Sequence, residues 1–137
     1  MKTFEFLEHT ADIKFQAFGK SIEEAFANSS LAMFNAMYKE KIKSTKTIEI
    51  SAEGHDLLSL LYNFLEELIF YLDSENFFLS EVKNIKIDKK EFKLIATLGG
   101  DAAENYKIGL DVKAVTYSDM QVSERDGKWV TQVVLDV

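Results

Sequence analysis

Carboxylates at two strand ends are the residues of this sequence best suited to chemistry. Asp12 closes the block His9-Thr-Ala-Asp12, where small residues interrupt a strand pattern. Asp136 stands alone among apolar residues, and Val137 after it adds carbonyl and terminal carboxylate oxygens. Such oxygens are the ligands that Ca²⁺ and Mg²⁺ prefer in proteins. Together, Asp12, Asp136 and Val137 would supply part of the shell of a divalent cation, with water completing it.

Each of these side chains also has a simpler interpretation. The sequence alone does not place Asp12 beside Asp136, and a single aspartate at a strand end is more often just solvated. His9 fits a packed or hydrogen-bonded histidine as well as a neighbour of the cation. His9 is therefore kept only as a candidate neighbour of the site.

Lys113 is a third candidate, and a hairpin argument relates it to Asp136. Asp126-Gly127 predicts a two-residue turn, because both positions of such a turn need positive φ. In an ideal hairpin about this turn, Tyr117 lies opposite Asp136. Lys113 then shares their face roughly 13 Å further along the strand, a gap that a bulge would shorten. The alternative is an exposed strand lysine without a role.

Hydrophobic periodicity predicts the elements that must position these residues. A capping box, Ser21 to Glu24, begins a helix of about seventeen residues, and a second helix follows Asp56, with its apolar stripe at Leu57–Leu72. Gly99-Gly100 predicts a turn. Alternation predicts strands at Phe4–Phe18 with a break at His9–Ala11, Ile48–Ala52, Phe77–Asp88, Glu91–Leu98, Leu110–Val122 and Lys128–Val137. The expected fold is α+β, a mostly antiparallel sheet with two helices packed on one face, in a single domain of residues 1–137.

Composition narrows the class of protein. The 137 residues are 47% hydrophobic, enough for one sizeable core, and carry a net charge of −7 with interleaved lysines. A clustered basic face is missing, so a direct grip on nucleic acid is not expected. The chain has no cysteine, no signal-peptide pattern and no apolar segment long enough to span a bilayer. A cytoplasmic protein without a membrane partner is therefore expected.

The motifs of common enzyme classes are missing. The sequence contains no Gly-x-x-x-x-Gly-Lys loop, no Gly-x-Ser-x-Gly elbow and no His-Glu-x-x-His pair. We therefore expect a protein that is not an enzyme. A small metal-dependent phosphohydrolase using Asp12 and Asp136, and a generic binding or chaperone module, remain as alternatives.

Several motifs, in order along the chain, resemble the archease family. They are Phe6-Leu-Glu-His-Thr-Ala-Asp-Ile13, Gly19-Lys-Ser-Ile-Glu-Glu-Ala-Phe26, the helix Leu57–Leu68, Val112-Lys-Ala-Val-Thr-Tyr117 and Val134-Leu-Asp-Val137. The resemblance covers nearly the whole chain. It implies an α+β fold and a divalent-metal site formed by Asp12, Asp136 and Val137, with Ca²⁺ the expected ion and Mg²⁺ or Mn²⁺ as alternatives.

The resemblance also implies a task in tRNA splicing and tRNA processing. A member of the family assists the GTP-dependent tRNA-splicing RNA ligase, promoting its guanylylation and its multiple turnover. A functionally important lysine near the end of the sheet is implied as well, and Lys113 is the best match. The sequence departs from the family pattern at Lys14, at Ser118 and between Gly100 and Asp111, and the two aspartates are unaffected.

Overall fold

A computed structural model describes residues 2–8 and 12–137. The helices are α1 (Ile22–Met37) and α2 (Leu57–Glu75), with a short 3₁₀ helix, η1 (Ala103–Asn105). The strands are β1 (Phe4–Leu7), β2 (Ile13–Gly19), β3 (Lys46–Glu53), β4 (Phe77–Asp88), β5 (Lys93–Ala102), β6 (Ala114–Arg125) and β7 (Lys128–Asp136). The predicted helices and strands all form, with shifted ends.

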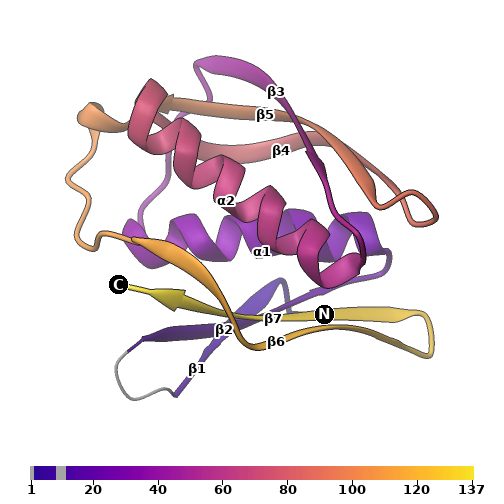
Figure 1. Cartoon of the computed structure of the whole chain (residues 1–137). Helices are drawn as coiled ribbons and strands as arrows, with labels where there is room; N and C mark the ends of the chain where they lie inside the picture. Colours follow the sequence, from indigo (N-terminus) through magenta and orange to yellow (C-terminus); the bar gives the residue numbers. More distant parts are fainter. Residues whose placement is uncertain (1, 9–11) are drawn as a thin grey trace.

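The strands form two sheets, and the two helices lie between them (Figure 1). One sheet has the order β1-β2-β7-β6 and the other β3-β5-β4, and all neighbouring strands are antiparallel. Helix α1 packs against β2 and β4, whereas α2 packs against β6 and β3, so each helix contacts both sheets. The α+β class and the antiparallel pairing are confirmed. The predicted strands divide between two sheets, each covered by the helices on one face.

Both helices begin at a polar cap. The Oγ of Ser21 accepts a 3.1 Å hydrogen bond from the Glu24 N–H, and the Glu24 carboxylate accepts one of 3.2 Å from the Lys20 N–H. In α2 the Asp56 carboxylate accepts from the Ser59 N–H at 2.7 Å, and the Ser59 Oγ accepts from the Asp56 N–H at 3.2 Å. These bonds satisfy N–H groups that have no partner within the helix.

Large aromatic side chains fill the space between the sheets. Helix α1 contributes Phe26 and α2 contributes Phe64, and their rings stack with centroids 6.5 Å apart. On β2, Phe15 and Ala17 are fully buried, as the alternation predicts. This packing fixes which face of β2 meets the helices. The residues that alternate with Phe15 and Ala17 along the strand therefore lie on its opposite face.

Strand β5 continues through Gly99 and Gly100, so the predicted turn at this pair is wrong. A side chain at Gly100 would collide with the Phe78 carbonyl oxygen and the Phe77 ring. Both glycines are buried in a strand that pairs on both edges, with β3 and β4. The close approach of Phe77 and Phe78 is the reason that this position takes glycine.

Among residues 2–8 and 12–137, no helix is long and apolar enough to cross a membrane.

Candidate functional site

The register of β2 against β7 brings the two candidate aspartates to the same end of the four-stranded sheet. Ile13 pairs with Leu135, and continuing this register by one residue puts Asp12 opposite Asp136. Residues directly opposite in an antiparallel pair have Cα atoms about 4.5–5.5 Å apart and side chains on the same face. Asp136 is exposed and Asp12 is partly buried. Asp12 and Asp136, 124 positions apart in sequence (136 − 12), each lie one residue beyond the last pair of this register, Ile13 with Leu135.

Strand β6 brings Lys113 to the same place, on the other side of β7. Ala114, not Tyr117, pairs with Asp136, so the prediction that Tyr117 lies opposite Asp136 is wrong. The reason is a large bulge. Between the pairs Thr116 with Val134 and Gln121 with Gln132, β6 has four residues, 117–120, and β7 has one, residue 133. These three extra residues shift the first part of β6 and draw Lys113 toward Asp136.

A backbone hydrogen bond fixes the result. The Lys113 N–H donates to the Asp136 carbonyl oxygen at 2.8 Å. The bulge is held from β7, because the Gln132 side chain donates to the Asp119 carbonyl oxygen at 2.8 Å. Asp119 adopts φ of 53°, a left-handed conformation that aspartate tolerates better than most residues. A bulge, which shortens the predicted gap between Lys113 and Asp136, is thus present.

The donors at this end of the sheet are hard oxygens, which suit a cation such as Ca²⁺ or Mg²⁺. Because the carbonyl oxygen of Asp136 already accepts the Lys113 N–H, Asp136 would contribute mainly its side-chain carboxylate. Val137 follows directly and is partly buried. Within the described ranges, no three Asp, Glu, His or Cys side chains form a metal-binding cluster. A site here would therefore depend on two carboxylates, main-chain oxygens and water. His9 lies outside the described residues.

The segment between Gly100 and Asp111 contains a buried carboxylate that no sequence motif singles out. Asp101 is 6% exposed and accepts hydrogen bonds from Thr45 Oγ1 and Tyr106 Oη, both at 2.6 Å, and from the Ala102 N–H at 2.8 Å. The bond from Thr45 is the main reason that the pKa of Asp101 is far below its ordinary value, followed by the bond from Tyr106. The Tyr106 hydroxyl in turn accepts from the Lys43 N–H at 2.9 Å. This network joins the segments before β3 and after β5.

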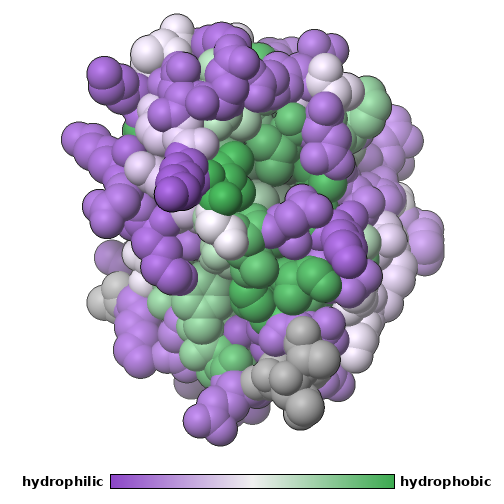
Figure 2. Space-filling model, turned by 90° about the vertical axis from the view of Figure 1, so that its left-hand side faces the viewer, coloured by the Kyte–Doolittle hydropathy of each residue, from purple (hydrophilic) through white to green (hydrophobic). Residues whose placement is uncertain are grey.

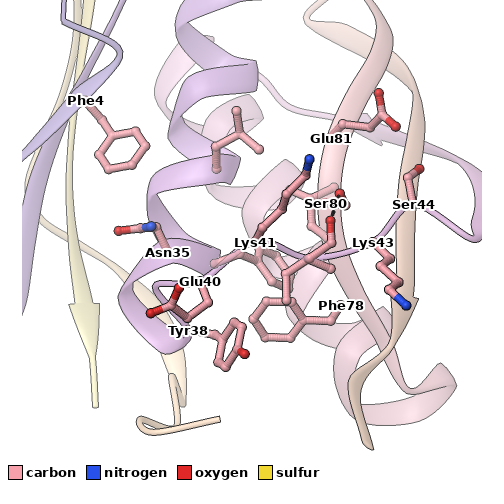
Figure 3. Close-up of a pocket in the computed structure, with 14 residues that line it drawn as sticks. Phe4, Asn35, Tyr38, Glu40, Lys41, Lys43, Ser44, Phe78, Ser80 and Glu81 are labelled. Atoms are coloured by element: carbon pink, nitrogen blue, oxygen red, sulfur yellow. Dashed lines mark hydrogen bonds between the residues drawn. The ribbon is translucent and has the colours of Figure 1, made fainter. Parts of the chain in front are cut away.

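A cavity of about 490 Å³ lies elsewhere, between α1, the segment after it and the start of β4 (Figure 3). Aromatic rings, two acidic residues and two lysines line it, so it has no strong preference for either sign of charge. Ser80 donates to the Ile42 carbonyl oxygen at 2.6 Å across its wall. Asp12, Lys113, Asp136 and Val137 are not among its lining residues, and we assign it no role.

The face of the molecule that includes the C-terminal end carries a band of hydrophobic side chains bordered by hydrophilic ones (Figure 2). A shallow hollow of about 530 Å³ is lined by the ends of both helices and by residues 108–111. The Gly109 N–H donates to the Met37 carbonyl oxygen at 3.0 Å, which ties this segment to the end of α1. The segment in which the sequence departs from the family pattern therefore contributes to this face.

Comparison with known proteins decides the family. The Archease protein family (MTH1598/TM1083) matches residues 4–137. The archease of Pyrococcus abyssi is 40% identical over 143 residues, covering all of both chains. The chain belongs to the archease family. The archease of Methanosarcina mazei is 38% identical over 141 residues, with 99% of this chain and 97% of that protein covered.

Solved structures agree with this assignment to the archease family. The solution structure of protein 1598 of Methanobacterium thermoautotrophicum has a TM-score of 0.75, 37% identity and full coverage of both chains. The crystal structure of a Thermotoga maritima archease, described as a possible chaperone, has a TM-score of 0.67 and 20% identity over 96% of this chain and 94% of that one. The second likeness concerns the fold alone. The family inferred from the motifs is confirmed.

Proposed function

We propose that this protein activates the GTP-dependent tRNA-splicing RNA ligase, promoting its guanylylation and multiple turnover, through a divalent cation held by Asp12, Asp136 and Val137. The observation that carries the proposal is the convergence of Asp12, Lys113 and Asp136 at one end of one sheet. Family membership over residues 4–137 supports it, because a task in assisting the ligase is what the resemblance to the family implies.

The chemistry of guanylylation explains why such a site would help. Transfer of GMP to the ligase releases pyrophosphate, so negative charge on the phosphate groups must be stabilised. A carboxylate-held cation orients phosphates and offsets their charge. In this chain the Asp12 and Asp136 carboxylates would hold the ion, and the backbone bond from Lys113 keeps the Asp136 main chain in place.

Lys113 has a separate part in this proposal. Its ammonium group has only donor hydrogens and cannot be a ligand to a cation. It is exposed beside Asp136, where a positive charge can meet a phosphate or a carboxylate of the partner. We expect it to act on the ligase complex and not on the bound ion.

The surface favours a protein partner over a nucleic acid. The net charge is −7, which opposes direct binding of an RNA backbone. The hydrophobic band in Figure 2 lies on the face that includes the C-terminal end of β7, and such patches are typical of protein contacts.

Guanylylation of the ligase tests the proposal. Ligase is incubated with labelled GTP and Ca²⁺ or Mg²⁺, with and without this protein, and the ligase–GMP adduct is followed in time. We expect the protein to speed formation of the adduct and to restore it after each ligation cycle. An unchanged rate with each ion, at saturating protein, would overturn the proposal.

A further inference from the structure

The carboxylate of Glu66 reaches from α2 to the outermost strand of the four-stranded sheet. Its Oε2 accepts a 2.7 Å hydrogen bond from the Val115 N–H. Strand β6 is the outer strand of this sheet, so this N–H needs a partner from outside the sheet. Glu66 is partly buried and Val115 is 2% exposed, so the bond is shielded from most of the solvent. Hydrogen bonds to a charged acceptor are the stronger kind.

The bond between Glu66 and Val115 lies where the register of β6 can change. Val115 lies between Lys113, which bonds to Asp136, and the bulge at residues 117–120. A strand next to a bulge can shift its register, since extra residues can be taken up on either side of the irregularity. A shift of the first part of β6 by one residue would break the contact of Lys113 with Asp136. A contact between Lys113 and the bulge is therefore needed to fix the register of β6. The hydrogen bond from Val115 to Glu66 is such a contact.

A second contact from α2 stabilises β6 on the other side of Val115. Tyr62 is one helical turn before Glu66, so both side chains lie on the same face of α2. The Tyr62 ring stacks on that of Tyr117, with centroids 4.3 Å apart and an interplanar angle of 6°. Tyr117 is the first residue of the bulge. Helix α2 thus contacts β6 immediately before the bulge and at its first residue.

We propose that Glu66 is a positioning residue: its bond to Val115 sets the register of the first part of β6 and so holds Lys113 beside Asp136. The consequence for the ligase rests on the proposed function, whereas the effect on the register does not. A purely structural role, in which Glu66 only stabilises the packing of α2 on the sheet, would lower stability without a specific effect on Lys113.

Amide hydrogen exchange measured by NMR tests the register directly. We expect Glu66→Ala to speed exchange of the Val115 and Lys113 amides by on the order of tenfold or more relative to β2 amides. Glu66→Gln, which keeps an acceptor of the same length, should restore most of the protection. Glu67→Ala is the matched control, because Glu67 is partly buried on the same helix and its side chain makes no hydrogen bond to the described residues. Unchanged protection of both amides in Glu66→Ala would overturn the proposal.

Ligase stimulation in a double-mutant cycle tests the consequence. If Glu66 acts through Lys113, Glu66→Ala lowers stimulation severalfold in the wild-type background and has no further effect in Lys113→Ala. Equal losses in both backgrounds, or no loss despite faster exchange, would overturn the positioning role. Should Glu66→Ala not fold, Glu66→Asp replaces it, since the shorter carboxylate keeps the charge but loses reach. If the wild type itself gives no stimulation, the proposed function fails, and amide exchange alone decides the register.

Discussion

The backbone N–H of Lys113 donates a 2.8 Å hydrogen bond to the carbonyl oxygen of Asp136. This bond joins the start of β6 to the end of β7, and the register of β2 adds Asp12 on the other side of β7. Because the bond uses main-chain atoms, it leaves the Lys113 ammonium and the Asp136 carboxylate available for separate tasks.

Asp12→Ala and Asp136→Ala should abolish cation binding with little effect on the fold. Asp136 is exposed at a strand end, and Asp12 lies outside the buried face of β2, so the metal-free variants should unfold within about 1 kcal/mol of the wild type. In the wild type, Ca²⁺ at one hundred times its Kd should add about 2.7 kcal/mol to the free energy of unfolding. Calorimetric titration and circular dichroism melts measure both effects. Wild-type Ca²⁺ affinity in Asp12→Ala would remove Asp12 from the site.

Lys113→Ala should reduce stimulation of the ligase without weakening Ca²⁺ binding. The substitution removes the ammonium group but keeps the N–H that bonds to Asp136, so the main chain at the site should not move. Multiple-turnover ligation and calorimetric titration of the same preparation make the comparison. A parallel loss of Ca²⁺ affinity and stimulation would show that Lys113 works through the ion site after all.

The purified protein should hydrolyse neither GTP nor RNA. The sequence has no phosphate-binding loop and no recognisable general base, and the proposed task leaves the chemistry to the ligase. Phosphate release and RNA integrity are measured with Ca²⁺, Mg²⁺ and Mn²⁺ in turn. Metal-dependent hydrolysis that disappears in Asp12→Ala would favour the phosphohydrolase alternative.

Asp101→Asn should destabilise the protein at neutral pH, and the difference from the wild type should shrink in acid. The hydrogen bonds from Thr45 and Tyr106 hold the pKa of Asp101 far below its ordinary value. The unfolded chain therefore binds this proton first, and the stabilisation is lost as pH falls below about 4. An asparagine would replace one of the two acceptor oxygens by an N–H₂ group, which would then face either the Thr45 or the Tyr106 hydroxyl donor. Urea unfolding of both proteins at pH 7 and pH 3 measures this, and a constant difference would contradict it.

The sequence predicts the elements well because the signals are local. Apolar periodicity and the caps at Ser21 and Asp56 locate both helices, and Asp126-Gly127 locates the last hairpin, where the two residues have φ of 54° and 75°. The two aspartates are candidate cation ligands from the sequence alone, because carboxylates are typical ligands of divalent cations. What these signals share is that each lies within a few residues of the feature it predicts.

The missed features depend on contacts between distant segments. The bulge in β6 has only a weak local marker: Asp119 is a residue type depleted in strands, but a single aspartate does not specify a register shift. Gly99-Gly100 looks like a turn until the Phe77 ring and the Phe78 carbonyl oxygen are placed beside Gly100. The role of Glu66 follows only once α2 lies over the outer edge of β6. Tertiary packing, and not propensity, decides each of these.

Multiple-turnover ligation with limiting ligase, comparing the wild type with the Asp12→Ala, Asp136→Ala double variant, tests the central claim most directly. The account predicts that the wild type raises the product well above one equivalent per ligase. The folded double variant should leave it at the level of ligase alone. Full stimulation by the folded double variant would contradict the account, because the cation site would then be incidental to the activation of the ligase.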